Sequence, residues 1–135
     1  MSVIPPPRLV IVESPFRPTE HRTAAQHREY LRCALADCIR RGESPFASHH
    51  LTPEVLQDDS PYERALGIRL GLAWGAHADL IAVYSQLGCS SGMMQAIQHY
   101  KAAGKRIEWR EIPLNEFRRI LAMELAELSQ AAGVP

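Results

Sequence analysis

The sequence has no excess of charge of either sign, because its 135 residues include 15 basic and 15 acidic side chains. A protein that binds nucleic acid typically presents a basic patch or stripe, so this balance argues against such a partner. No apolar run approaches the roughly 20 residues of a membrane-spanning helix. The first seven residues, MSVIPPP, lack the charged start and long apolar segment of a signal peptide. We therefore expect a cytoplasmic protein with no nucleic-acid or membrane partner.

The sequence is also poor in cysteine and in several well-known motifs. Three cysteines, an odd number, fit free thiols better than a disulfide framework. No cysteines and histidines have the spacing of a structural zinc site, and we expect neither a metal nor another cofactor. The G-x-S-x-G, P-loop and G-x-G-x-x-G motifs are absent. The serine-dependent α/β-hydrolase, P-loop nucleotide-triphosphatase and dinucleotide-binding classes that these motifs mark are therefore excluded.

The clearest structural signal that is present lies between residues 80 and 104. Residues 80–84, LIAVY, are apolar and partly β-branched, as in a buried parallel strand. A turn rich in glycine and serine, GCSSG at 88–92, follows, and residues 93–103 have the apolar spacing of a helix that Gly104 ends. The turn of a strand–turn–helix unit lies at the carboxyl end of the strand, where open α/β sheets bind ligands.

This turn suits a phosphate or a sugar hydroxyl. Ser90 and Ser91 offer hydroxyl groups, Gly92 lets the backbone approach a ligand closely, and the new helix presents free N–H groups. The alternative is that a serine simply caps the helix. Cys89 is a weaker candidate, a nucleophile only if the helix start lowers the pKa of its thiol.

The rest of the chain predicts alternating strands and helices. After a proline-rich lead-in at 1–7, residues 8–135 form one domain. The expected strands are 8–13, 44–48, 80–84 and 106–112, and the expected helices are about 20–41, 60–77, 93–103 and 116–132. Their order predicts an α/β fold with a doubly wound parallel sheet of about four strands. The strand at 8–13 should be central and the strand at 106–112 should lie at an edge.

The helix predicted over 60–77 has two contrasting faces. Its apolar face should pack on the sheet and consists of Leu66, Leu70, Ala73 and Trp74. Glycines also recur at four-residue steps, at 67, 71 and 75, and each destabilises a helix by about 1 kcal/mol relative to alanine. This glycine row indicates that a strand, another helix, a ligand or a partner subunit approaches closely. Close packing within the chain is the simplest of these explanations.

Polar residues follow several of the predicted strands, and parallel strands would gather them at one edge of the sheet. The candidate ligand-binding residues are Ser14, Pro15, Phe16, Arg17, Ser48, His49, His50, Asp59, Tyr84, Gly88, Ser90, Ser91, Gly92 and Met93. Structural alternatives exist for several members of the set. Glu13 can pair with Arg17, the two histidines can cap a strand, and Asp59 can belong to a solvated turn.

Short motifs in a fixed order, over about residues 8–112, resemble those of the nucleoside 2-deoxyribosyltransferase superfamily and of its short bacterial and phage branch. They are ESPF at 13–16, PFASH at 45–49, Glu63-Arg64 with Gly67 and Trp74, Ala78-Asp79, and SGM at 91–93. The resemblance implies a flavodoxin-like, three-layer α/β/α fold and a pocket for a nucleoside or nucleotide. It also implies a homo-oligomer, which would form through the helix with the glycine row or through the last helix.

Characterised members of that superfamily cleave or exchange an N-glycosidic bond. In them a glutamate on the helix after the turn attacks the anomeric carbon of the sugar, as a carboxylate nucleophile can. The corresponding residues here, MQAIQ at 94–98, include no carboxylate. Glu13 and Glu63 are the remaining candidates for a relocated catalytic carboxylate, and Glu63 also fits a capping box that begins at Ser60.

These observations leave three functions open. The first is a nucleoside- or nucleotide-binding protein without the usual nucleophile. The second is an active N-glycosidase or deoxyribosyltransferase that uses a relocated carboxylate. The third is a protein that sequesters a ribosylated nucleotide signal in phage–host conflict.

Overall fold

A computed structural model of the chain describes residues 5–47, 55–57 and 59–131. Its strands are β1 (Leu9–Glu13), β2 (Ser44–Phe46), β3 (Leu80–Tyr84) and β4 (Ile107–Arg110). Its helices are α1 (Ala24–Arg40), α3 (Pro61–Gly75), α4 (Ser91–Ala102) and α5 (Leu114–Ala131).

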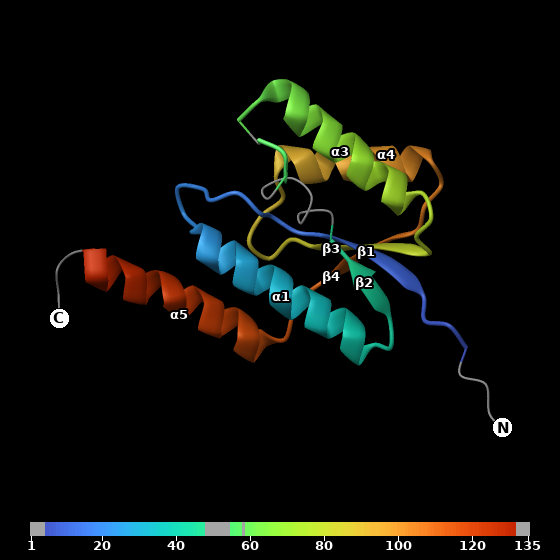
Figure 1. Cartoon of the computed structure of the whole chain (residues 1–135). Helices are drawn as coiled ribbons and strands as arrows, with labels where there is room; N and C mark the ends of the chain where they lie inside the picture. The colour runs from blue at the N-terminus through green and yellow to red at the C-terminus, as the bar shows by residue number, and fades with distance from the viewer. Residues whose placement is uncertain (1–4, 48–54, 58, 132–135) are drawn as a thin grey trace.

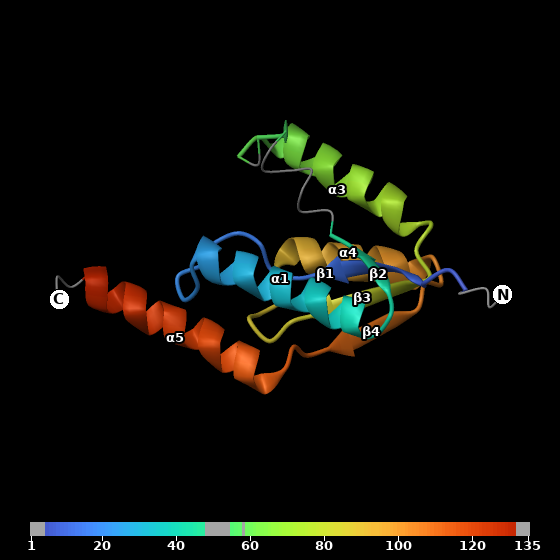
Figure 2. The same ribbon diagram turned by 60° about the horizontal axis from the view of Figure 1, so that its bottom comes forward.

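The four strands form one parallel sheet in the order β2-β1-β3-β4, so β1 is central and β4 is an edge strand, as predicted. Helices α1 and α5 cover one face of the sheet, and α3 and α4 cover the other (Figures 1 and 2). This is a three-layer, flavodoxin-like α/β/α arrangement, in which the winding direction reverses between β1 and β3.

The core has two parts because successive side chains of a strand point to opposite faces. Toward α1 and α5 the sheet contributes Val10, Val12, Leu80, Ala82 and Tyr84. Toward α3 and α4 it contributes Ile11, Ile81 and Val83, which pack against Met93, Ala96, Ile97 and Tyr100 of α4. Both faces of the sheet are therefore buried, as in other parallel sheets.

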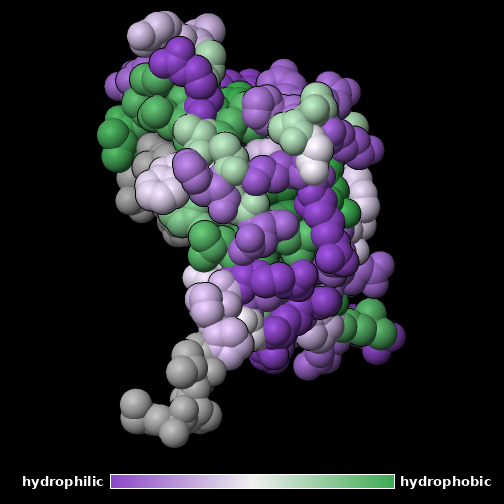
Figure 3. All heavy atoms as spheres, turned by 90° about the vertical axis from the view of Figure 1, so that its right-hand side faces the viewer, coloured by the Kyte–Doolittle hydropathy of each residue, from purple (hydrophilic) through white to green (hydrophobic). Residues whose placement is uncertain are grey.

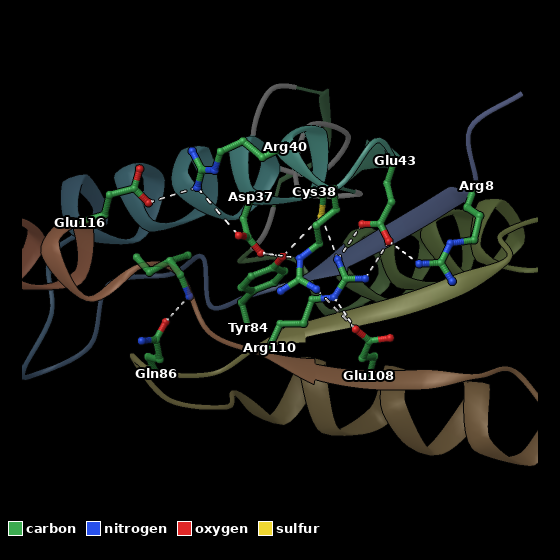
Figure 4. A network of polar contacts seen from close by, with 12 residues as sticks. Arg8, Asp37, Cys38, Arg40, Glu43, Tyr84, Gln86, Glu108, Arg110 and Glu116 are labelled. Carbon is green, nitrogen blue, oxygen red and sulfur yellow. Dashed lines mark hydrogen bonds and ion pairs between the residues drawn. The ribbon is translucent and has the colours of Figure 1, made fainter. Parts of the chain in front are cut away.

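A network of paired polar groups connects the sheet to α1 (Figure 4). Arg110 donates to both carboxylate oxygens of Glu43 at 2.7 Å, and the side chains of both residues are only 2% exposed. Arg8 donates to Glu43 as well, at 2.7 Å. Arg110 beside it holds the pKa of Glu43 below its usual value. The Tyr84 hydroxyl donates to Asp37 at 2.7 Å, so this face contains charged groups that are mutually satisfied.

Helix α1 begins later than the sequence predicted, at residue 24 rather than near 20. Thr23 is the N-cap: its side chain accepts from the backbone N–H of Gln26 at 3.1 Å, and Gln26 accepts in return from the N–H of Thr23 at 2.9 Å. Ahead of the helix Thr19 closes a turn, because its hydroxyl accepts from the N–H of Arg22 at 3.1 Å. The capping box that Thr23 and Gln26 form sets the start of α1.

The N-cap of α3 is Ser60, as predicted, but the expected capping box is incomplete. The Ser60 side chain accepts from the N–H of Glu63 at 3.4 Å. The N–H of Ser60 donates to the carbonyl of Gln57 at 3.2 Å rather than to the Glu63 side chain.

The inward face of α3 is the glycine row, contrary to the prediction that large apolar residues would pack on the sheet. All three glycines are buried. Leu70 is 40% exposed and Trp74 is 59% exposed on the outward side, where the Trp74 ring lies 5.5 Å from the ring of Phe46. A helix without side chains on one face approaches its neighbour more closely than leucines would allow.

We predict that Gly75→Ala destabilises the fold. A Cβ atom at position 75 would overlap the ring of Tyr100, and overpacking of this kind costs about 1–3 kcal/mol. Urea unfolding should show this loss. Gly92→Ala is the control: a Cβ there would meet only the Ser90 hydroxyl oxygen, at 3.9 Å, so its stability should equal or exceed that of wild type. Equal stability of the Gly75→Ala variant and wild type would refute the close packing of α3 on α4.

Candidate functional site

A cavity of about 370 Å³, called the inner cavity below, opens beyond the carboxyl ends of β1 and β3. Its volume lies within the roughly 300–1,000 Å³ typical of small-molecule sites. The segments that follow the two strands, α3 and α4 form its walls. The lining residues are Glu13, Ser14, Pro15, Phe16, Arg17, Thr19, Arg64, Gly67, Ile68, Gly71, Leu72, Leu87, Gly88, Cys89, Ser90, Gly92, Met93, Ala96 and Tyr100.

Glu13, the last residue of β1, contributes a buried carboxyl group to this cavity. Ile11 faces α3 and α4, and the two-residue period of a strand puts Glu13 on the same side. The residue is only 7% exposed, and burial raises the pKa of its carboxyl group to about 7. Within the described ranges no hydrogen bond or ion pair involves this carboxyl group, so the alternative that Glu13 pairs with Arg17 is not observed there.

Ser14 is a second polar group of the inner cavity without a partner. It is 1% exposed, and its hydroxyl makes no hydrogen bond with the described part of the chain. A buried hydroxyl without a hydrogen bond costs free energy. A ligand in the cavity can offer the missing partner.

The turn between β3 and α4 forms another wall. Ser90 is the N-cap of α4, because its hydroxyl accepts from the N–H of Met93 at 3.2 Å. The capping role that the sequence left open as an alternative is therefore real. A hydroxyl that accepts one bond can still donate to a ligand. The idea of a lowered Cys89 pKa is wrong, because burial and the nearby Glu13 carboxylate raise the pKa of this thiol.

A second cavity, of about 410 Å³ and called the outer cavity below, adjoins the first. It is lined by Arg17, Asp59, Pro61, Arg64, Ala65, Ile68, Ser91 and Gln95. Arg17, Arg64 and Ile68 line both cavities. A ligand with two chemically different parts can therefore extend from one cavity into the other.

Most of the residues that the sequence singled out meet at these two cavities. The inner cavity gathers Glu13, Ser14, Pro15, Phe16, Arg17, Gly88, Ser90, Gly92 and Met93. Asp59 and Ser91 line the outer cavity. The candidates Ser48, His49 and His50 lie outside the described residues.

Tyr84 and Glu63 do not line either cavity. Tyr84 is completely buried on the opposite face of the sheet, where its hydroxyl donates to Asp37 at 2.7 Å. Glu63 lies in the first turn of α3, and its backbone N–H takes part in the Ser60 cap. The prediction that Tyr84 faces the site was wrong because the sequence does not reveal which way a strand buried on both faces is turned.

Sequence reasoning missed the contribution of α3 to the cavity wall. Arg64, Gly67, Ile68 and Gly71 all line the inner cavity. The glycine row was a usable signal, since it predicted a close approach at this helix. Arg64 lies three residues before Gly67 and therefore on the same side of the helix.

The described residues contain no group of three or more metal-ligating side chains. Among them there is also no helix of the length and apolarity needed to cross a membrane.

Comparison with known proteins gives one match. The model of a family described as a domain of unknown function, DUF7768, matches residues 8–110. That match covers every strand of the sheet and α1, α3 and α4. Neither the curated proteins nor the solved structures give a match.

We predict that Glu13 makes stability fall as pH rises from about 4.5 to about 7. In this interval the folded protein, with its raised pKa, keeps a proton that the unfolded chain releases near pH 4.5. Replacement by neutral glutamine removes this dependence. The stability of Glu13→Gln relative to wild type should therefore rise by up to about 3 kcal/mol across the interval.

Urea unfolding at several pH values between 4 and 8 measures this difference. Glu111→Gln, a change at an exposed carboxyl group, is the control and should keep the wild-type profile. Parallel profiles for Glu13→Gln and wild type would mean that Glu13 is not buried as described.

Proposed function

The chain belongs to the DUF7768 family, a domain of unknown function, and from the residues of its site we propose that the protein binds a nucleoside or nucleotide. The single observation that supports this proposal best is the buried Glu13 carboxyl group in the inner cavity. No residue in the described ranges satisfies it. An unsatisfied polar group of this kind is typical of a place where a ligand supplies the partner.

The chemistry of the cavity walls fits a sugar joined to a flat base. Ile68, Leu72, Met93 and Ala96 form an apolar surface against which a base can pack. Glu13 and the hydroxyl groups of Ser14 and Ser90 provide polar partners. As a carboxylate Glu13 accepts hydrogen bonds from hydroxyl or amino groups, and as a neutral acid it also donates one.

An N-glycosidase or deoxyribosyltransferase is the second candidate, and the same residue favours it. An ionised Glu13 could attack the anomeric carbon, forming a glycosyl ester as the base leaves with the bonding electrons and takes up a proton; water then hydrolyses the ester. Helix α4 offers no such group, since Gln95 lines the outer cavity and Ala96 the inner one. Among the described residues, Glu13 is the one carboxylate of the inner cavity.

We predict binding without turnover. Nucleosides and their 5′-monophosphates should raise the melting temperature and give a saturable signal in calorimetry, because a ligand of the native state stabilises it. Chromatography should detect no released base. Glu13→Gln should weaken binding roughly tenfold, as expected for loss of a hydrogen bond to a charged group. Glu63→Gln, which changes a carboxylate outside both cavities, is the matched control.

Each alternative has its own result in these assays. Base release by wild type that Glu13→Gln abolishes, with a glycosyl adduct in the intact mass, would establish the enzyme instead. Glycosidase activity gained by Ala96→Glu would support a binder derived from an enzyme. Preferential binding of a ribosylated nucleotide, without turnover, would favour sequestration in phage–host conflict. Absence of binding throughout the panel would refute the proposed function.

We also propose that the protein forms a homo-oligomer, through the outward face of α3 or through α5. The glycine row faces inward, so it is not the contact surface itself. The outward face exposes Tyr62 (77%), Leu70 (40%) and Trp74 (59%). Figure 3, which is coloured by hydropathy, shows hydrophobic and hydrophilic residues side by side near its top, at the level of α3 in Figure 1. Exposed apolar residues that lie together are typical of protein contacts.

Sedimentation at micromolar concentration measures the state of association. We expect a dimer or larger oligomer in wild type and a smaller species for Trp74→Glu, whose charge would be buried in the contact. Trp109→Glu, at an exposed residue of β4, is the control for loss of an exposed tryptophan. A monomeric wild type would refute this proposal.

A further inference from the structure

Arg64 is a cation on the inward side of α3. It is half-buried and lines both the inner and the outer cavity. No hydrogen bond or ion pair joins its guanidinium group to another residue in the part of the chain that the structure describes. By contrast, the fully buried Arg110 is paired with Glu43. A guanidinium group that lines a cavity and has no carboxylate within ion-pair distance among the described residues is available to bind an anion.

The surroundings of Arg64 extend the positive site. Arg17, from the segment after β1, lines the same two cavities. The N-terminus of α4 reaches the outer cavity at Ser91. The N–H groups of Ser91 and Gly92 have no acceptor in the described structure, as expected for the first turn of a helix. Free N–H groups and the helix dipole both favour an anion at this place.

The outer cavity also has an acidic side chain among its described residues. Asp59 is there with Arg17 and Arg64, and it is the one acidic side chain among the described residues that line this cavity. At the other end of the site, Glu13 and the unpartnered hydroxyl of Ser14 lie in the inner cavity and not in the outer one. The site is therefore polarised, with a carboxyl group in one cavity and guanidinium groups where the two cavities meet.

We infer that Arg64, with Arg17 and the N-terminus of α4, binds the phosphate of a nucleoside monophosphate whose sugar and base occupy the inner cavity. This inference rests on the proposed function and narrows its ligand class. A phosphate has about −1.5 to −2 charges at pH 7 and three acceptor oxygens, which suit a planar guanidinium group. Glu13 repels a phosphate when it is ionised, so the charged end of the ligand lies toward the outer cavity.

The test compares nucleosides with their monophosphates by isothermal titration calorimetry. Each of adenosine, guanosine, cytidine, uridine and thymidine is paired with its 5′-monophosphate. Wild type should bind the monophosphate of the preferred pair at least about tenfold more tightly than the nucleoside. A charge-assisted hydrogen bond to the phosphate contributes an affinity difference of about this size. That advantage should shrink as sodium chloride is raised from 50 to 500 mM, because salt screens exposed charges.

Arg64→Gln should bring the ratio of the two affinities close to one, and Arg64→Lys should restore part of it. Arg69→Gln, which removes an arginine from the exposed side of the same helix, should leave the ratio as in wild type. Equal affinities for nucleoside and monophosphate in wild type would overturn the inference while leaving the proposed function intact. A phosphate preference that survives Arg64→Gln would overturn it as well. Failure of every nucleoside and every monophosphate to bind would overturn both.

Discussion

The hydrogen-bonded pairing of β1 with β3 is the constraint on which the remaining architecture depends. The two strands run parallel, in a register that places Val10 beside Leu80 and Glu13 beside Val83. Their carboxyl ends therefore stop at the same level. From β1 the chain crosses by α1 on one face, and from β3 it crosses by α4 on the other, so the following segments diverge (Figure 2). Such a divergence leaves a crevice at the topological switch point, and the inner cavity occupies it.

The two faces of the sheet differ in whether their buried polar groups have partners. On the α1 side, Arg110 and Glu43 are buried and satisfy each other, and removal of one partner from such a pair typically costs about 3–5 kcal/mol. On the α3 and α4 side, Glu13 and Ser14 are just as buried but have no partner in the described ranges. An unmade hydrogen bond costs about 1–3 kcal/mol per group. The first face therefore holds its buried charged groups in pairs, and the second leaves polar groups without a partner among the described residues, at the wall of the inner cavity.

Much of this fold could be predicted because its strands are short apolar runs between glycine, proline and polar segments. Strand β3 has the predicted bounds, and the parallel sheet has β1 at a central position and β4 at an edge, as the sequence predicted. The sequence predicted less well which side chains of a strand face which layer of helices. Tyr84 belongs to a strand whose five residues are all buried, so no alternation of polar and apolar residues reveals its direction. Its partner Asp37 is 47 residues away in the sequence.

The inward face of α3 was mispredicted for a related reason. Large apolar residues normally mark the buried side of a helix, and Leu70 and Trp74 pointed to that side. This rule fails for α3, because the ring of Tyr100 fills the space against Gly75 and leaves no room for a larger side chain there. That ring comes from α4, 25 residues later in the chain, and a periodic pattern within one helix contains no information about it. The glycine row correctly indicated a close approach but not what approaches.

The ionisation of Glu13 affects both candidate functions, binding and catalysis. Near pH 7 its carboxyl group is divided between neutral and charged forms, since burial raises its pKa to about 7. Only the charged form is a nucleophile, and only the neutral form can protonate a leaving base. Glycoside hydrolysis ordinarily assigns these tasks to two carboxyl groups a few ångströms apart. The inner cavity supplies Glu13 alone among the described residues, while Asp59 lines the outer cavity, with Arg17 and Arg64 where the two cavities meet. A single carboxyl group with a divided charge state suits hydrogen bonding to a bound nucleotide better than bond cleavage, and this favours the binding function over the enzymatic one.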